Sequence, residues 1–95
     1  MQRIKIETAL AVLDRLGLHI RDAGLLDSAL ERPVTTVFGK PVYSSVSLAA
    51  AVQTESIARN HSLIDGNKRT ALILLNAFLR VNGYKHIMDS ETSYN

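Results

Sequence analysis

The sequence predicts an all-α fold, a small helical bundle, and three observations support that prediction. Aliphatic residues recur at intervals of three and four positions, as on one face of a helix. Only two prolines and five glycines interrupt the chain, and all but Gly24 fall between the periodic segments. Hydrophobic residues make up 46% of the chain and charged residues 21%, values typical of a globular protein. We therefore expect a single domain over residues 1–95.

The composition also excludes several classes of function. The sequence contains no cysteine, which excludes a disulfide scaffold, a Cys-ligated metal site and thiol catalysis. No apolar run approaches the ~20 residues that span a bilayer, so we expect no membrane contact. The formal net charge of +2 is too small to predict nucleic-acid binding by itself. A cytoplasmic protein fits all of these features.

Two amphipathic helices are expected in the first third of the chain. The first covers about residues 6–16 and ends at Gly17, a residue that tolerates the left-handed conformation common just past a helix. The second covers about residues 23–32, with Asp22 as its N-cap and Pro33 as its end. Both helices carry an apolar stripe on one face.

Residues 34–43 differ from the segments around them. β-Branched and aromatic residues flank the turn-forming Gly39-Lys40-Pro41, which predicts a short β-hairpin or extended flap. Two strands without a larger sheet are marginally stable alone, so we expect this flap to pack against the helices or against a partner.

Two further helices are expected after the flap. The third begins after Ser47, which can cap it, and ends near Asn60. The fourth begins near Asn67 and ends at Gly83, and its residues 71–81 are apolar on nearly every side. Because a helix that is apolar all round is usually buried, we expect the fourth helix in the middle of the domain.

Polar and ionisable residues gather in the connection between these two helices. Residues 61–70 have the sequence His-Ser-Leu-Ile-Asp-Gly-Asn-Lys-Arg-Thr. The first N–H groups of a helix lack intrahelical partners, and the helix dipole adds partial positive charge there. Gly66 lets the chain turn closely over that end, while Lys68 and Arg69 add two cations. Together these features predict a phosphate-binding pocket.

Two other side chains complete the expected site. Asp65 lies on the rim of the pocket, where its carboxylate can hold a divalent cation that a polyphosphate shares. His61 can be neutral at pH 7 and can take a proton from an approaching hydroxyl. A base, a metal ligand and a phosphate-binding pocket on one loop together indicate phosphoryl or nucleotidyl transfer.

Simpler explanations apply to each residue alone. A histidine at a helix end is most often a surface or capping residue, and Asp65 or Asn67 could simply cap the fourth helix. Lys68 and Arg69, however, are unfavourable beside the positive end of a helix dipole unless an anion binds there. A DNA-binding helix that starts at Asn67 is a weak alternative, because that helix is too apolar for a groove.

The loop resembles the signature of the Fic/Doc family. His61-x-Leu63-x-Asp65-Gly66-Asn67-Lys68-Arg69 is similar to the family pattern H-x-F-x-[D/E]-[G/A]-N-[G/K]-R, with Leu63 in the place of Phe. Residues 20–33 are similar to the segment before the flap in the death-on-curing (Doc) branch. The resemblance covers residues 17–83 and implies a Fic/Doc-like helical bundle with a β-hairpin flap and a central apolar helix after the catalytic loop.

The resemblance assigns a role to each residue of the loop. His61 would be the general base, and Asp65 would hold Mg²⁺. The groups that would bind the phosphates of ATP are Gly66, Asn67, Lys68 and Arg69, and Lys68 and Arg69 would also act in catalysis. Doc-like chains usually continue through one or two helices beyond the position of residue 95. A truncated chain, a degenerate relative or completion by a partner would each explain the difference.

Lys68 separates the two branches of the family. Fic-type AMP transferases usually have glycine at that position, whereas Doc-type toxins have a lysine, which is associated with an inverted nucleotide that presents its γ-phosphate. The resemblance therefore implies a kinase-like toxin that transfers the γ-phosphate of ATP to a Ser or Thr hydroxyl of a translation factor, by analogy elongation factor Tu. Protein AMPylation by the same loop and a catalytically dead, antitoxin-binding module are the alternatives.

The resemblance also implies two protein contacts. In the family, the flap pairs with an extended stretch of the target, and a Phd-like antitoxin folds a disordered tail into a groove of the toxin. The inhibitory motif [S/T]-x-x-x-E-[G/N] of other family members has no match in this chain. We therefore expect restraint by a separate antitoxin and no direct contact with nucleic acid.

Overall fold

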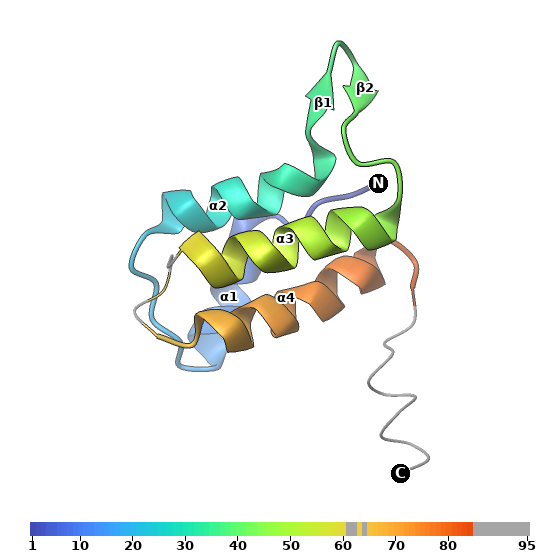
Figure 1. Ribbon diagram of the computed structural model, residues 1–95. Coiled ribbons are helices and arrows are strands. Elements are labelled where there is room, and N and C mark those ends of the chain that lie inside the picture. Colours follow the sequence, from blue (N-terminus) through green and yellow to red (C-terminus); the bar gives the residue numbers. More distant parts are fainter. Residues whose placement is uncertain (61–62, 64, 85–95) are drawn as a thin grey trace.

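The computed structural model describes residues 1–60, 63 and 65–84, and this part of the chain is mostly helical. Its elements are α1 (Ile6–Arg15), α2 (Ala23–Glu31), the 3-10 helix η1 (Arg32–Val34), β1 (Thr36–Val37), β2 (Lys40–Pro41), α3 (Val46–Asn60) and α4 (Asn67–Val81). Helices α2, α3 and α4 lie side by side, α1 packs against α2, and the β1–β2 hairpin projects away from the helices (Figure 1). The prediction of a helical bundle with a short hairpin is confirmed for the described residues.

The first two helices begin and end largely as their sequence predicts. Gly17 follows α1 with a φ of 74°, in the left-handed region that glycine adopts without strain. The carboxylate of Asp22 accepts a hydrogen bond from the N–H of Leu25 at 3.1 Å and so caps α2. The α-helix ends at Glu31, but the chain continues through Pro33 as the 3-10 helix η1. The α-helix therefore ends two residues before Pro33, and Pro33 itself lies in the 3-10 helix that follows.

Helix α3 begins at Val46, two residues earlier than predicted. Its capping hydroxyl belongs to Ser45, which accepts a hydrogen bond from the N–H of Leu48 at 3.1 Å. The carbonyl of Ser45 also accepts from the N–H of Ala49 at 3.0 Å, the first bond of the helical ladder. The expectation that Ser47 caps the helix was wrong, because nearby serines compete for the same role and only one has the N-cap position.

The hairpin forms where predicted, with a different turn. Its antiparallel register pairs Thr36 with Pro41 and Val37 with Lys40. The two turn residues are Phe38, with a φ of 52°, and Gly39, with a φ of 76°. Positive φ at both positions indicates a type I′ turn, whose twist matches that of the strands. The turn is therefore Phe38-Gly39, whereas the sequence favoured Gly39-Lys40-Pro41.

Helix α4 buries one face. The side chains on that face are Thr70, Ala71, Leu74 and Phe78. On the opposite face Leu72 is 53% exposed, and Val81, the last residue of the helix, is 47% exposed. The expectation that α4 lies in the middle of the domain, surrounded by other helices, is not confirmed by the described part of the chain.

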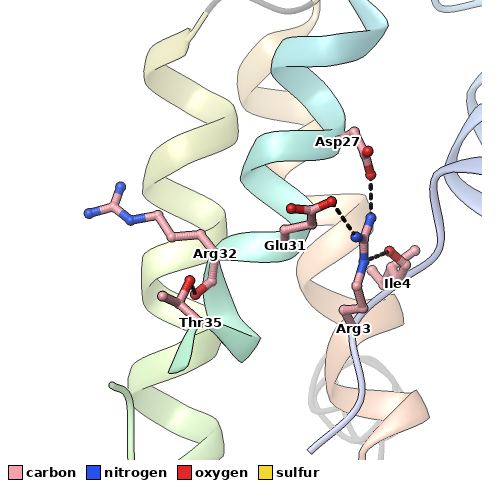
Figure 2. Close-up of polar contacts among 6 residues, drawn as sticks. All are labelled: Arg3, Ile4, Asp27, Glu31, Arg32 and Thr35. Carbon is pink, nitrogen blue, oxygen red and sulfur yellow. Dashed lines mark hydrogen bonds and ion pairs between the residues drawn. The ribbon is translucent and has the colours of Figure 1, made fainter. Parts of the chain in front are cut away.

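The N-terminal segment ties the bundle together at two points. Arg3 forms ion pairs with Asp27 and, at 3.1 Å, with Glu31, both on α2 (Figure 2). At the other end, the side-chain amide of Asn82 donates to the carbonyl of Gln2 at 2.9 Å and accepts from its N–H at 2.7 Å. Residues just before α1 thus join α2 to the end of α4.

The core is aliphatic and lies between the four α-helices of the described chain. Its buried hydrophobic residues are Ile4, Ala9, Leu13, Leu26, Ala29, Leu30, Ala49, Ala50, Ile57, Leu63, Ala71, Leu74 and Phe78. Four alanines from α2, α3 and α4 allow the helix backbones to approach closely, and Phe78 is the largest side chain in this set. Within residues 1–60, 63 and 65–84, no helix is long and apolar enough to cross a membrane.

Candidate functional site

The connection into α4 turns at Gly66. This residue has φ 74° and ψ 20°, in the left-handed region, and it is the N-cap of α4. A Cβ added to Gly66 would lie only 2.9 Å from Cδ2 of Leu18. The backbone conformation therefore favours glycine, and any larger residue would also require the side chain of Leu18 to shift.

Asn67 holds the loop in shape from the first turn of α4. Its Oδ1 accepts a hydrogen bond from the N–H of Leu63 at 3.0 Å, and its Nδ2 donates to the carbonyl of Leu63 at 3.1 Å. The side-chain amide thus satisfies both backbone groups of one loop residue. In the structure the side chain of Asn67 is engaged with the loop backbone, and its place in the phosphate pocket stays a prediction.

Leu63 is the apolar anchor of the loop. Its side chain is 1% exposed, and its backbone forms an antiparallel bridge with Ile20. Leu18, which lies against Gly66, comes from the same segment between α1 and α2. The sequence analysis did not assign Leu18 and Ile20 to the site, although the alternation Leu18-His19-Ile20 is the pattern of an extended segment with one buried face.

The start of α4 is open to an anion. Among the described residues no side chain caps the helix, and its first ladder bond runs from the N–H of Thr70 to the carbonyl of Gly66 at 2.8 Å. The explanation that Asp65 or Asn67 is an ordinary N-cap is therefore wrong for this structure. The N–H groups ahead of Thr70 have no capping side chain and carry the positive end of the helix dipole.

The cations lie at the same end. Lys68 and Arg69 are both exposed, and neither has an ion-pair partner among the residues that the structure describes. Two adjacent cations beside an uncapped helix start repel one another and the dipole, and an anion would relieve both effects. The local electrostatics favour a bound phosphate group.

The structure brings five of the six predicted site residues together on one turn. Asp65, Gly66, Asn67, Lys68 and Arg69 follow one another at the start of α4, whereas His61 lies outside the described residues. Asp65 is exposed at the rim of this turn. Mg²⁺ in nucleotide sites takes one or two carboxylates and completes its shell with water and phosphate oxygens. The exposed carboxylate of Asp65 beside this turn is of the kind that could hold such an ion.

Two buried polar atoms of the α3–α4 interface have no hydrogen-bond partner among the described residues. They are Oγ1 of Thr70 and Oε1 of Gln53, both in fully buried side chains. The amide nitrogen of Gln53 donates to the carbonyl of Leu74 at 3.0 Å, so α3 and α4 are joined by a polar contact inside an apolar interface. The sequence analysis did not single out either residue.

The C-terminal end of α3 is also anchored. Nδ2 of Asn60 donates to the carbonyl of Leu25 in α2 at 2.8 Å. Arg32 at the other end of α2 donates to Oγ of Ser56 at 2.8 Å. These two bonds fix the position from which the chain leaves α3 toward the loop.

Comparison with known proteins agrees with this arrangement. The model of the Fic/DOC family matches residues 2–79. A curated relative, the protein named Toxin Doc of Mycolicibacterium smegmatis (strain ATCC 700084 / mc(2)155), is 47% identical over 72 residues. That match covers 76% of this chain and 55% of the relative, so the chain spans about half the length of the curated relative. No solved structure gives a significant match.

Proposed function

Because the chain belongs to the Fic/Doc family, we propose that it carries the catalytic loop of a Doc-like toxin of a toxin–antitoxin pair. In this proposal it transfers the γ-phosphate of ATP to a Ser or Thr hydroxyl of a translation factor, with elongation factor Tu as the first candidate. The relative named Toxin Doc supports the toxin role. The observation that carries the proposal is the uncapped start of α4 at Gly66, with Lys68 and Arg69 exposed beside it.

The residues of the loop have complementary tasks in this reaction. The N–H groups at the start of α4, together with Lys68 and Arg69, bind and orient the phosphates of ATP. Asp65 holds Mg²⁺, which offsets negative charge on the phosphates. Asn67 keeps the loop in one shape through Leu63, so the phosphate-binding groups need no rearrangement when the nucleotide arrives.

The transfer step can be written with its atoms and electrons in balance. The hydroxyl oxygen of the target attacks the γ-phosphorus, and the bond from that phosphorus to the oxygen that bridges it to the β-phosphate breaks. His61 takes the hydroxyl proton, and ADP leaves with the electrons of the broken bond. The products are a phosphorylated Ser or Thr and ADP.

Lys68 supports the γ-phosphate as the transferred group. In the family resemblance, a lysine at this position goes with the inverted nucleotide, and a glycine goes with AMP transfer. Protein AMPylation would use the same turn and the same base, and it differs in the phosphorus that the hydroxyl attacks. We also propose that a Phd-like antitoxin restrains the chain, since the chain contains no inhibitory motif of its own.

Labelled ATP tests the proposal. The purified chain is incubated with elongation factor Tu, Mg²⁺ and ATP labelled at either the γ- or the α-phosphorus, with His61→Ala as the control. We expect γ-label on elongation factor Tu, and none with the control variant. Label from the α-position would identify an AMP transferase, and equal labelling by the parent and the His61→Ala chain would overturn the catalytic role of His61.

A further inference from the structure

A groove with an arginine on each wall lies between α2 and α3. Its volume is about 350 Å³, and the two arginines are Arg32, where α2 ends, and Arg59, in the last turn of α3. The two helices lie side by side (Figure 1). None of the described residues that line the groove belongs to the turn at Gly66. The groove is therefore a second cationic feature, separate from the start of α4.

The side chain of Arg32 is held in place although it is exposed. Its Nη1 donates to Oγ of Ser56 on α3 at 2.8 Å. Its carbonyl accepts from the N–H of Thr35 at 3.2 Å and from the hydroxyl of the same residue at 2.8 Å. Figure 2 shows the guanidinium of Arg32 on the other side of α2 from the ion pairs of Arg3. An arginine that is already positioned loses less conformational entropy when it binds a ligand.

The positive charge of the groove is only partly matched. Arg32 has no ion-pair partner in the part of the chain that the structure describes. Arg59 pairs with Glu55 at 3.5 Å, and the two side chains are 75% and 57% exposed. An exposed pair of this kind is weak and exchanges readily for a stronger partner. The helix dipole explains a cation in the last turn of α3, but it does not explain why Arg32 reaches across to the neighbouring helix.

Hydroxyl groups and an apolar floor complete the groove. Because Oγ of Ser56 is the acceptor for Arg32, its own hydrogen remains to be donated, and the described residues give it no acceptor. Ser28 lines the groove from α2 and is exposed. Between these polar groups lie Leu25, which is half-buried, and Ala29, which is 2% exposed. The groove thus combines hydrogen-bond donors at its walls with a small apolar surface.

We propose that this groove is a binding site for a phosphomonoester. The phosphate lies between the guanidinium groups of Arg32 and Arg59 and accepts a hydrogen bond from the hydroxyl of Ser56. The small apolar group that the phosphate esterifies packs on Leu25 and Ala29. This inference goes beyond the proposed function and does not depend on it, because the site shares no residue with the catalytic turn.

Charge and donor number favour phosphate over carboxylate. A phosphomonoester carries about 1.5 to 2 negative charges at pH 7 and has three acceptor oxygens. Two guanidinium groups can therefore each bond to it through two N–H groups. A carboxylate has one charge and two oxygens, and Glu55 already supplies one to Arg59. Glu55 is thus a competitor of the ligand for the second arginine.

The first test is a titration with phenyl phosphate. Amide shifts of the isotope-labelled chain are followed by NMR at physiological salt and about pH 8, where the phosphate is a dianion. We expect shifts at residues 25–32 and 55–60. Arg32→Gln should weaken binding there at least tenfold, and benzoate, which has one carboxylate on the same ring, should bind the parent at least tenfold more weakly. Arg15→Gln removes an exposed arginine from the last turn of α1 and should bind as the parent does.

Glu55→Gln and Arg59→Gln give a test with opposite signs. Glu55→Gln releases Arg59 from its pair and should tighten binding of phenyl phosphate two- to fivefold, whereas Arg59→Gln should weaken it. Both residues are exposed, so neither change threatens the fold. Arg32→Lys keeps the charge but loses the planar fork, and it should bind several-fold more weakly than the parent. If Arg32 only held α2 against α3, changes at Glu55 and Arg59 would leave binding unaltered.

Several outcomes overturn the inference. They are shifts confined to residues 65–70, equal binding by Arg32→Gln and the parent, benzoate binding as tight as that of phenyl phosphate, and weaker binding by Glu55→Gln. A blocked peptide with one phosphoserine among alanines then identifies the source of the phosphate. Tighter binding than that of phenyl phosphate supports a phosphorylated protein segment, and weaker binding supports a free phosphomonoester. No measurement uses ATP or a protein substrate, so failure of the proposed function would leave this inference standing.

Discussion

The side-chain amide of Asn67 is hydrogen-bonded to both the N–H and the carbonyl of Leu63, at 3.0 and 3.1 Å. These two hydrogen bonds join the first residue of α4 to the preceding loop. Leu63 is in turn buried and bridged to Ile20, so the clamp connects the first residue of α4 to the segment between α1 and α2. The turn at the start of α4 therefore rests on two parts of the chain that are distant in sequence, residues 18–20 and residues 63–67.

Asn67→Asp tests the clamp. An aspartate keeps the acceptor for the N–H of Leu63 but places a second carboxylate oxygen against its carbonyl, where the donor was. We expect a net loss of about 1–3 kcal/mol in the free energy of unfolding, because repulsion and a lost donor outweigh the roughly 0.3–1 kcal/mol that an anion gains at a helix start. Urea unfolding measures the change, and Asn67→Ala should cost less. A more stable Asn67→Asp chain would show that the dipole dominates.

Gly66→Ala should be much more harmful than Gly17→Ala. Both glycines have a φ of 74°, so alanine meets the same backbone strain at each, roughly 1–2 kcal/mol. A Cβ on Gly17 meets no atom within 4 Å, whereas a Cβ on Gly66 lies 2.9 Å from Leu18. Thermal unfolding of the two variants isolates the cost of the contact, since the strain is matched. Equal destabilisation would mean that Leu18 moves aside freely.

Leu63→Phe restores the residue of the family pattern and should nevertheless destabilise this chain. Leu63 is 1% exposed, so there is no free space for the larger ring. We expect the resulting overpacking to lower the free energy of unfolding by about 1–3 kcal/mol. Leu63→Ala should lower the free energy of unfolding by about 2–5 kcal/mol, because the smaller side chain leaves a cavity. Chemical denaturation measures both variants. Stabilisation by Leu63→Phe would show that the loop has room for the ring and is loosely docked.

Thr70→Val should stabilise the fold. The two side chains have nearly the same shape, and Oγ1 of Thr70 is buried with no partner, so its removal relieves a penalty of about 1 kcal/mol or more. For a domain of this size that gain raises Tm by roughly 4–8 °C. Thr54→Val is the matched control, because Oγ1 of Thr54 donates to the carbonyl of Ala50 at 2.8 Å and its loss should give no gain. Calorimetry of both variants tests the difference.

Lys68→Gly should change which phosphorus is attacked. If the lysine is what presents the γ-phosphate, its removal leaves room for the α- and β-phosphates and moves the label on the target from the γ- to the α-position. Lys68→Arg keeps a cation and a long side chain and should retain γ-label. Both variants are assayed with ATP labelled at either position. Continued γ-labelling by Lys68→Gly would show that other groups orient the nucleotide.

Local sequence signals predicted the elements of the fold well. Apolar periodicity, the capping carboxylate of Asp22 and the positions of Gly17 and Gly66 are all readable within a few residues. The same is true of the phosphate-binding turn, because Gly66, Lys68 and Arg69 are consecutive or nearly so, and the start of any helix has the same orphan N–H groups. The clustering of these residues on one turn follows from chain connectivity.

Choices between equivalent neighbours were not predictable. Ser45 and Ser47 both suit an N-cap, and the hairpin turn could have used either of two overlapping segments, so the tertiary setting selected Ser45 and Phe38-Gly39. The sequence also did not predict that α4 is buried on one face only. Its sequence is apolar on nearly every side, and which side is covered depends on how many other elements pack around it.

The sequence alone determined that Asp65, Gly66, Lys68 and Arg69 cluster at a helix start, because these residues are neighbours along the chain. Only the tertiary structure decided how the cluster is held: Leu18 against Gly66, Ile20 paired with Leu63, and the amide of Asn67 turned inward. It also placed the hairpin at the far end of α3 from the loop. The contacts of Leu18 and Ile20 join residues more than 40 positions apart, and the hairpin is separated from the loop by a whole helix. These relations depend on packing and distance, which no local pattern encodes.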